Sequence, residues 1–320
     1  MIFNNADHDS PPVSTLFPPT TDPGAHTRLY HARHIGAYYG FSRLYLKLEG
    51  LNPSGTQKDR VAAQVIAEAL TRGDPGVTVG TCGNFGVALA RVCQAAQLPC
   101  HIFIPRQYTC ERVPEMLDCG AAISYVCGTY EEAVIASQEY AQHSGFYDAN
   151  PSGIGGAAAL AAYREIAFEV LDDLGETPAS LWVVVGNGTT LAGIHRGFKQ
   201  RGTLPRLGAV GSLGNTALTA SIPNGVYRDL APDDIRESLL NEALVSWRSL
   251  HGDAGVRAIR ESRGWCYEAT DRELRTAARL LLTMEQIESQ PSSAGALLGL
   301  QLMAQHGVDP HAAHVVVLTS

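Results

Sequence analysis

The sequence has no apolar run of the roughly 18–20 residues that a membrane-spanning helix needs. It also has no excess of basic residues. The formal net charge is -8, which argues against nucleic acid or an acidic membrane surface as the main partner. Residues 1–23 are polar and show no basic segment followed by an apolar one, so we expect no signal peptide and a cytoplasmic location.

Patterns typical of metal sites are absent as well. The seven cysteines include no C-x-x-C pair, and no two of the eleven histidines are four residues apart. Several cysteines lie in apolar segments, which is typical of buried, reduced thiols in a cytoplasmic protein. The sequence therefore predicts no metal site.

The chain is rich in apolar segments that alternate between strand-like and helix-like patterns. Its 320 residues are 45% apolar and 18% charged, enough for one large or two medium domains. The alternation predicts an α/β fold whose mostly parallel sheets are covered by helices on both faces. Residues 222–255 are the least regular stretch. We expect strands at 43–49, 77–80, 100–104, 121–126, 181–185, 207–211 and 314–318, and helices at 59–71, 84–96, 111–119, 130–143, 156–174, from 190, 270–287 and 293–305.

Lys58 follows a turn-forming stretch, residues 52–57, and falls in the first turn of the helix that begins near residue 59. A helix N-terminus favours anions and disfavours a cation by up to about 1 kcal/mol. A lysine in this place is suited to act as a neutral amine or as an imine, which is how lysine holds an aldehyde cofactor. The alternative is a solvated surface lysine.

Residues 80–86 form the first of two strand-to-helix junctions that are candidate ligand sites. Ligands of open α/β sheets bind at the carboxyl ends of the strands. This loop combines small residues, hydroxyl and amide groups and a helix N-terminus, which suit an anion such as a carboxylate. Taken alone, the loop is better explained as an ordinary turn with a Thr or Asn cap.

Residues 185–193 form the second junction, after a fully apolar strand. Two glycines let backbone N–H groups turn inward, and two threonines add hydroxyl groups, which together predict a phosphate site at a helix N-terminus. No Gly-Lys-Ser/Thr follows, and Leu191 stands where the third glycine of G-x-G-x-x-G belongs. The phosphate is therefore expected to belong neither to a P-loop nucleotide nor to a Rossmann dinucleotide.

Two hydroxyl-rich segments lie near the end of the sequence. Ser292 and Ser293 open a helix, where a plain N-cap would also explain them. Thr319 and Ser320 follow the last buried strand, at the edge of the sheet where ligands bind. A frayed terminus is the alternative interpretation of that second pair.

Five segments in order carry a family resemblance: Asn-Pro-Ser-Gly-Thr-x-Lys-Asp-Arg (52–60), Thr-x-Gly-Asn (81–84), Gly-Asn-Gly-Thr-Thr (186–190), Pro-Ser-Ser-Ala (291–294) and Leu-Thr (318–319). The chain from residue 44 to residue 320 resembles the pyridoxal-phosphate enzymes of the tryptophan-synthase β fold (fold type II), and threonine synthase most. The resemblance implies two lobes, each an open, mostly parallel sheet covered by helices, with the cofactor in the cleft between them. It assigns residues 1–45 and 150–320 to a large domain and 46–149 to a smaller, mobile one.

The same resemblance implies a role for each candidate site residue. Lys58 would form the internal aldimine with pyridoxal phosphate and move protons at the substrate Cα and Cβ. Asn84 would hydrogen-bond the phenolic oxygen, and Thr319 would face the pyridine nitrogen. The cofactor phosphate would be held by Gly186, Asn187, Gly188, Thr189 and Thr190. The substrate would contact Thr81, Cys82, Gly83, Phe85 and Asn150. Because the family commonly forms dimers, we expect a homodimer.

The hydroxyl of Thr319 bears on the type of reaction. A hydroxyl opposite the ring nitrogen, in place of a carboxylate, leaves the ring unprotonated and weakens it as an electron sink. Such a site suits elimination and replacement at the β-carbon better than transamination. The expected enzyme is therefore a lyase or synthase.

Departures from threonine synthase leave the substrate open. In that family the segment after the Asn-Pro dipeptide supplies an arginine for the phosphate of O-phosphohomoserine. Here no basic residue lies between Asn150 and Arg164, and a dianion without a guanidinium partner loses its strongest contacts. In addition, Cys82 stands where the family usually has Ser or Thr, and Gln57 replaces an aromatic residue.

Three hypotheses follow from these observations. The first is an elimination or replacement enzyme for an activated homoserine, serine or threonine derivative, O-phosphorylated or otherwise activated. The second is a serine- or threonine-type ammonia-lyase (dehydratase), which needs neither a phosphate clamp nor a second nucleophile. The third is a non-catalytic protein that binds pyridoxal phosphate or phosphate.

Overall fold

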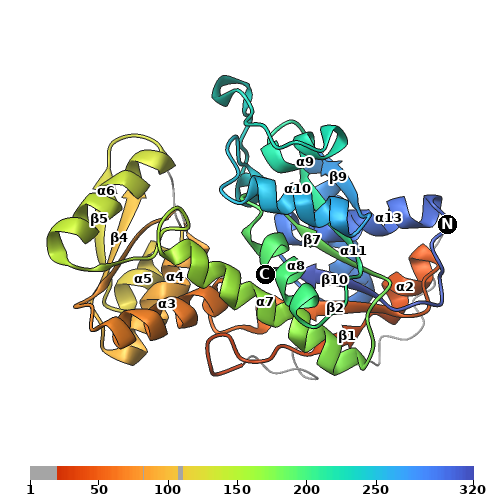
Figure 1. Cartoon of the computed structure of the whole chain (residues 1–320), viewed down its shortest axis with the longest axis horizontal. Helices are drawn as coiled ribbons and strands as arrows, with labels where there is room; N and C mark the ends of the chain where they lie inside the picture. Colours follow the sequence, from red (N-terminus) through yellow and green to blue (C-terminus); the bar gives the residue numbers. More distant parts are fainter. Residues whose placement is uncertain (1–19, 82, 107–110) are drawn as a thin grey trace.

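Two separate β-sheets organise the chain in the computed structural model, which describes residues 20–81, 83–106 and 111–320 (Figure 1). Both sheets are mostly parallel and are flanked by helices, which confirms the predicted α/β fold class. The smaller sheet comes from one continuous stretch of sequence, whereas the larger one combines strands from both ends of the chain.

The larger sheet has six strands in the order β1-β2-β10-β7-β8-β9. β1 is antiparallel to β2, and all other neighbours are parallel. The strands are β1 (Leu29–His31), β2 (Leu44–Leu48), β7 (Ser180–Val184), β8 (Arg206–Ser212), β9 (Trp265–Ala269) and β10 (His314–Leu318). β2 crosses the boundary predicted between residues 45 and 46, and the division into two domains stays a prediction.

The smaller sheet has four parallel strands in the order β5-β4-β3-β6. The strands are β3 (Val77–Gly80), β4 (Cys100–Pro105), β5 (Ala122–Val126) and β6 (Tyr147–Asp148). It belongs to the lobe at the left of Figure 1.

Helix α7 (Gly155–Leu174) links the two lobes. It packs against α3 (Lys58–Arg72), which follows β2, and against α8 (Thr189–Gln200), which follows β7. In Figure 1 it runs from the smaller lobe into the larger one. The other helices are α2 (Arg33–Tyr39), α4 (Asn84–Ala96), α5 (Val113–Asp118), α6 (Tyr130–Ser144), α9 (Ala217–Ser221), α10 (Gly252–Glu261), α11 (Asp271–Glu285), α12 (Pro291–Ala294) and α13 (Leu298–Gln305).

The central strands are apolar throughout because both of their faces are covered. Successive side chains of a strand point to opposite faces of its sheet. In β10, Val315 and Val317 accordingly enter one hydrophobic core, and Val316 and Leu318 enter the other. All four are at most 1% exposed. This double burial explains why a continuous apolar run, without alternation, predicted this strand correctly.

The structure differs from the expected elements in a few places. Residues 293–305 were expected as one helix, but α12 is followed by the 3-10 turn η5 (Gly295–Leu297) before α13 begins. The strands β1, β6 and β9 and the helices α2, α9 and α10 were not predicted. The irregular stretch 222–255 contains only short 3-10 turns, η2 (Ile222–Asn224), η3 (Pro232–Asp234) and η4 (Glu242–Leu244), before α10 begins.

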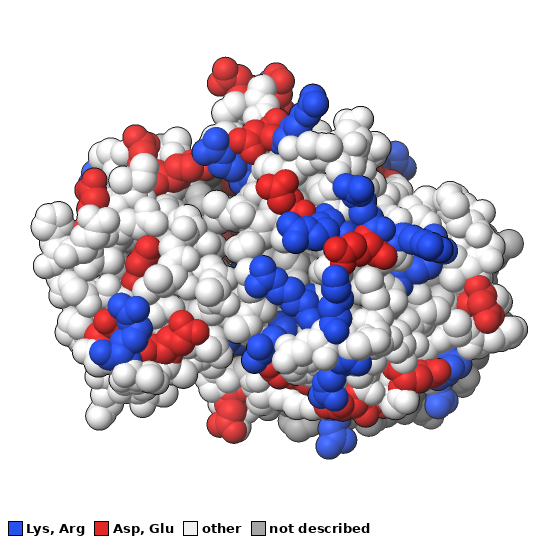
Figure 2. All heavy atoms as spheres, viewed as in Figure 1, with Lys and Arg blue, Asp and Glu red and all other residues white. Residues whose placement is uncertain are grey.

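Charge is distributed unevenly over the surface. On the face shown in Figure 2, Lys and Arg side chains gather over the larger lobe, while much of the smaller lobe is uncharged. The net charge of -8 therefore conceals a locally basic region. None of the helices in the described part of the chain is long and apolar enough to span a membrane.

Candidate active site

The topology brings three loops to one edge of the larger sheet. β10 lies between β2 and β7 and is parallel to both, so the carboxyl ends of the three strands are neighbours. The turn that leads to Lys58 follows β2, residues 186–190 follow β7, and Thr319 follows β10. Because ligands bind at this edge of parallel sheets, the order of the strands by itself predicts a site here.

A cavity of about 120 Å³ lies where these loops meet. Every residue that was predicted from the sequence as a cofactor contact lines this cavity. These are Lys58, Asn84, Gly186, Asn187, Gly188, Thr189, Thr190 and Thr319, and the remaining lining consists of Thr56, Gln57, Val184, Val185, Ala243, Leu244, Gln290, Ser292 and Ser320. Lys58 and Thr319, which are 261 positions apart in sequence, thus line the same cavity.

Residues outside the loop 186–190 hold it in place by donating hydrogen bonds to its carbonyl groups. Ser249 Oγ donates to the carbonyl of Gly186 (2.9 Å), and the N–H of His251 donates to the carbonyl of Asn187 (2.9 Å). The Asn187 side chain also accepts a hydrogen bond from Ser246 Oγ (3.2 Å). The acceptors of the loop are therefore used by the scaffold.

The donors of the same loop remain free. Among the described residues, none accepts a hydrogen bond from the backbone N–H groups of residues 186–190. The N–H groups of Thr189 and Thr190, the first two residues of α8, lie at the positive end of the helix dipole. Free donors at a helix N-terminus form an anion site, and a phosphate suits them.

Gly188 is required by the shape of this loop. Its φ of 78° is in the left-handed region, which favours glycine. A Cβ at this position would also lie 2.6 Å from Leu218 Cδ1 and 3.0 Å from the carbonyl oxygen of His251. The loop therefore fits closely against the segment that holds it.

Lys58 differs from the other lysines in its surroundings. The sequence contains three lysines, Lys47, Lys58 and Lys199. Lys47 is fully buried and paired with Glu169, and Lys199 pairs with Glu261 on the surface. Lys58 alone lines the cavity, and its Nζ lies 5.9 Å from the centre of the Tyr163 ring.

The turn before Lys58 is fixed by Asp59. The backbone N–H of Ser54 donates to both carboxylate oxygens of Asp59 (3.1 and 3.2 Å), and the Ser54 hydroxyl donates to one of them. Burial raises the pKa of Asp59, and the hydrogen bonds from Ser54 oppose that change. The N–H of Lys58 donates to Thr56 Oγ1 (3.2 Å), so Lys58 begins its helix at a defined place.

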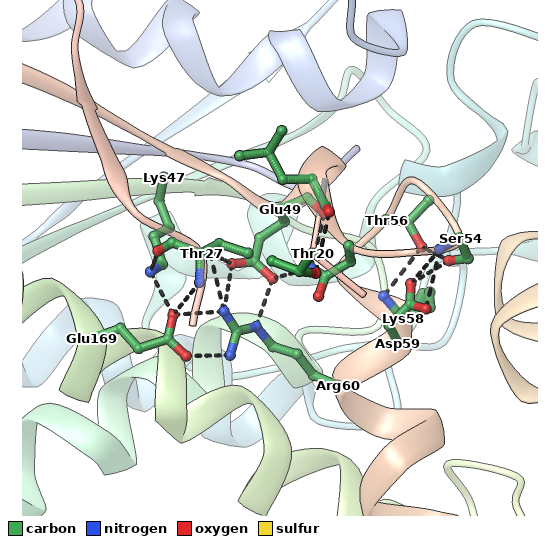
Figure 3. Close-up of polar contacts among 12 residues, drawn as sticks. Thr20, Thr27, Lys47, Glu49, Ser54, Thr56, Lys58, Asp59, Arg60 and Glu169 are labelled. Carbon is green, nitrogen blue, oxygen red and sulfur yellow. Dashed lines mark hydrogen bonds and ion pairs between the residues drawn. The ribbon is translucent and has the colours of Figure 1, made fainter. Parts of the chain in front are cut away.

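A buried ion network is centred on Arg60, the third residue of α3 (Figure 3). Arg60 donates to Glu49 (2.6 and 2.9 Å) and to Glu169 (2.6 and 2.7 Å), and Lys47 also pairs with Glu169. All four residues are at most 9% exposed. Burial alone would raise the pKa of Glu49, but the Arg60 guanidinium holds it below its usual value. The network ties β2, α3 and α7 together and so anchors the helix that carries Lys58.

Two buried polar atoms at the cavity have no partner in the described part of the chain, Gln57 Oε1 and Ser320 Oγ. The backbone N–H of Gln57 donates to the carbonyl of Thr319 (2.9 Å), which joins the Lys58 turn to the end of β10. Buried polar atoms without partners are unusual, because each costs about 1–3 kcal/mol. They fit a site that receives a polar ligand.

The predicted substrate contacts that the structure describes do not line this cavity. Thr81 and Gly83 lie between β3 and α4, Phe85 follows Asn84 in the first turn of α4, and Cys82 lies outside the described residues. Asn150 is fully buried, and its amide is bound by the scaffold: it accepts from the N–H of Gly80 (3.0 Å) and donates to Ser137 Oγ (2.8 Å). The substrate role of these residues stays a prediction.

Several lining residues were not predicted from the sequence. Ala243 and Leu244 belong to the irregular stretch, where nothing in the sequence indicates a contact with the cavity. Gln290 has a weak signal, since it stands directly before the Pro-Ser-Ser motif. It accepts a hydrogen bond from Asn84 Nδ2 (3.2 Å).

A sequence profile described as "Pyridoxal-phosphate dependent enzyme" matches residues 20–320. The chain belongs to this family. Its cofactor is therefore pyridoxal 5'-phosphate, as predicted. The site fits this cofactor, since one lysine, a set of backbone N–H donors without acceptors among the described residues, and two polar atoms without partners there surround one cavity.

Characterised relatives in the family include threonine synthases. The enzyme of Methanosarcina acetivorans is 26% identical over 310 residues, which cover 94% of this chain and 75% of the relative. The enzyme of Synechocystis is 28% identical over 316 residues, which cover 96% of this chain and 79% of the relative. The predicted resemblance to fold type II enzymes, and to threonine synthase among them, is thus confirmed.

Solved structures of fold type II enzymes superpose on the chain. Threonine deaminase isoform 2 from Solanum lycopersicum has a TM-score of 0.77 at 18% identity, covering 92% of this chain and 83% of its own. A fungal L-serine ammonia-lyase from Rhizomucor miehei has a TM-score of 0.75 at 20% identity, covering 92% and 93%. At these identities the likeness shows the fold alone.

Proposed function

We propose that this family member catalyses elimination or replacement on an activated amino acid, as threonine synthase does, with Lys58 binding pyridoxal phosphate as an imine. The observation that supports this most is the single cavity that combines Lys58, Asn84, the loop 186–190 and Thr319. Four chain segments supply these residues, and each has a different chemical group to offer. A protein that only bound phosphate would need the loop 186–190 and none of the others.

The residues of the chain have separate tasks in this proposal. The free N–H groups of residues 186–190 hold the phosphate, and Asn84 and Thr319 orient the ring from its two sides. The bound cofactor supplies the electron sink that stabilises negative charge at the substrate Cα. Lys58 would act as the base that removes the substrate Cα proton and as the acid that returns protons to the carbon skeleton. A hydroxyl at Thr319 in place of a carboxylate favours elimination and replacement.

A basic cavity next to the cofactor site supports a substrate with an anionic activating group. This cavity of about 880 Å³ shares Thr56, Gln290 and Ser320 with the cofactor site. Three arginines, Arg112, Arg275 and Arg279, line it beside one carboxylate, Glu288. Neither Arg275 nor Arg279 has an ion-pair partner in the described ranges. They offer guanidinium groups that the segment after Asn150 lacks.

A serine- or threonine-type ammonia-lyase is the second candidate. The observation that favours it is the absence of a basic residue in 150–156, because a neutral hydroxy-amino acid needs no guanidinium. The two candidates differ in their products. Elimination followed by hydration of O-phosphohomoserine yields threonine and inorganic phosphate, whereas the lyase yields a keto acid and ammonia.

The proposal is tested with purified protein loaded with pyridoxal phosphate. Borohydride reduction followed by peptide mass spectrometry is expected to place the cofactor on Lys58. The loaded protein is then incubated with O-phosphohomoserine, O-phosphoserine, O-acetylserine, serine and threonine, while the absorption spectrum and the products are followed. Lys58→Ala is expected to lose the imine band and roughly 10²–10⁴-fold in rate, since it removes the base.

Lys199→Ala is the matched control, because Lys199 is a lysine on the surface that pairs with Glu261. It is expected to match the unmodified protein in spectrum and rate. A wild-type protein that shows no spectral response to any of these amino acids, and is indistinguishable from Lys58→Ala, would show that the proposed function is wrong.

A further inference from the structure

Arg112 stands directly before α5 and connects three parts of the active site. Its Nη1 donates to Asn84 Oδ1 (2.8 Å), and its Nη2 donates to the carbonyl of Ser54 (2.9 Å) in the turn before Lys58. Its Nε and Nη2 also donate to the two carboxylate oxygens of Glu115 (2.7 and 2.9 Å). The side chain is 25% exposed, at the edge of the basic cavity. None of the roles predicted for the site residues involves Arg112.

The chemistry of the guanidinium fixes the orientation of the Asn84 amide. Arginine has five N–H donors and no acceptor, so only the oxygen of an amide can face it. The amide NH2 of Asn84 must therefore point the other way, toward the cavity, where it donates to Gln290 Oε1 (3.2 Å). The two ends of an amide are nearly indistinguishable by shape, so a neighbour of one hydrogen-bonding type is what selects between them.

We propose that Arg112 is a positioning residue that presents the Asn84 NH2 to the phenolic oxygen of pyridoxal phosphate. The inference rests on the proposed function, since it assumes that the cofactor binds with that oxygen beside Asn84. A flipped amide would place its oxygen against the phenolic oxygen, and two acceptors repel. The Glu115 carboxylate keeps Arg112 in place for this task.

The contact with Ser54 extends this role to Lys58. Ser54 is bound to Asp59, the neighbour of Lys58, so Arg112 joins the loop that carries Asn84 to the turn that carries the amine. The imine nitrogen and the phenolic oxygen of the cofactor are close neighbours in one molecule. Binding of the cofactor at both atoms therefore requires a fixed spacing between Lys58 and Asn84.

The competing explanation is that Arg112 only stabilises α5 through Glu115. Both explanations predict some loss of stability when Arg112 is removed. Only the positioning role predicts that cofactor affinity and the absorption spectrum of the bound cofactor change through Asn84. The test therefore uses these two measurements and a double-mutant cycle.

The variants are Arg112→Met, Arg112→Lys, Asn84→Ala and the double variant Arg112→Met with Asn84→Ala. The dissociation constant of pyridoxal phosphate and the absorption spectrum from acid to alkaline pH are measured for each. Arg112→Met is expected to weaken the binding of pyridoxal phosphate by about 10-fold, which corresponds to the loss of one hydrogen bond to a charged group. It should also shift the absorption band of the bound cofactor in the same direction as Asn84→Ala does. Arg112→Met should have no further effect once Asn84 is alanine. Arg112→Lys keeps a donor and is expected to recover part of the loss.

Arg91→Met is the matched control. Arg91 also pairs with Glu115 (3.5 Å) but has no contact with Asn84. It should leave affinity and spectrum unchanged. If Arg112→Met does not fold, Arg112→Gln carries the same test, because its amide is too short to hold Glu115 and Asn84 together.

The outcomes separate this inference from the function on which it rests. If the wild-type protein forms no imine with pyridoxal phosphate, the proposed function fails. If it does, and the Arg112 variants match it in affinity and spectrum, the positioning role is overturned while the function stands. Effects of Arg112→Met that simply add to those of Asn84→Ala would also overturn it, because Arg112 would then not act through Asn84.

Discussion

At the scale of single residues, Gly188 is the position where the backbone itself limits the sequence. Its left-handed φ and the contacts with Leu218 and His251 leave no room for a side chain. Gly188→Ala is expected to destabilise the protein by more than the roughly 1–2 kcal/mol of the left-handed conformation alone, since the loop must also move. The shifted loop should weaken the binding of pyridoxal phosphate, measured by titration.

Gly202→Ala separates these two causes. Gly202 has a φ of 74°, and a Cβ there would meet no atom within 4 Å. This variant should show the conformational cost alone in urea unfolding, with unchanged cofactor affinity. Equal losses of stability in the two variants, and equal affinity, would mean that the contacts at Gly188 do not matter.

Single residues also show what the sequence can and cannot predict. Lys58 follows a turn-forming stretch at the start of a helix, and Thr319 and Gly186 closely follow the strands β10 and β7, so these positions could be predicted as site candidates from the local pattern. Arg112 could not, because its partners Asn84 and Ser54 are 28 and 58 residues away and its own segment carries no motif. A role that depends on which groups are neighbours in space leaves no local signal.

At the scale of elements, the ion network of Arg60 holds α3 against β2 and α7. The two positive charges of Lys47 and Arg60 balance the two negative charges of Glu49 and Glu169. Arg60→Met leaves one buried carboxylate without its partner, and breaking a buried pair in this way costs about 3–5 kcal/mol. The loss should appear as a lower urea midpoint with an unchanged slope.

Neutralising a carboxylate should restore part of that loss. Glu49→Gln in the Arg60→Met background removes the unpaired charge, so the double variant should be more stable than Arg60→Met alone. Arg72→Met is the control on the same helix, since Arg72 is an exposed residue paired with Asp74. It is expected to show no measurable change. If Arg60→Met behaved like Arg72→Met, the network would have no anchoring role.

The elements that could be predicted are those with a long, regular pattern. Helix α4 has apolar residues at helical spacing, and the buried strand β10 is a continuous apolar run. The strands β1 and β6 have three and two residues, too short for any period to show. β9 is only partly buried and mixes Cys266 and Glu268 with aromatic residues, so its pattern resembles neither strand type.

At the scale of the whole molecule, the order of the strands decides where the site lies. This order cannot be predicted from local patterns in the sequence. β2 and β10 are the neighbours that bring Lys58 to Thr319, yet they are separated by almost the whole chain. Pairing at this distance depends on the combined packing of both cores. The family resemblance, and no local pattern, made the cleft predictable.

The whole molecule should also lose stability in mild acid, because four buried or half-buried histidines resist protonation. Burial lowers the pKa of His101, His195, His251 and His314 below the usual 6.5, although Glu261 opposes this at His195 and Asp309 at His314. The unfolded chain binds protons at these groups as the pH falls below about 6.5, while the folded chain does not. Their contribution to the free energy of unfolding is fully present above that pH and is lost as the pH falls through the folded pKa values.

Urea unfolding from about pH 7 to about pH 5 should show this decline in stability, and His101→Gln should make the decline shallower. His306→Gln, at an exposed position, should leave it unchanged. A free energy of unfolding that stays constant over this range would contradict the assignment of these histidines as neutral.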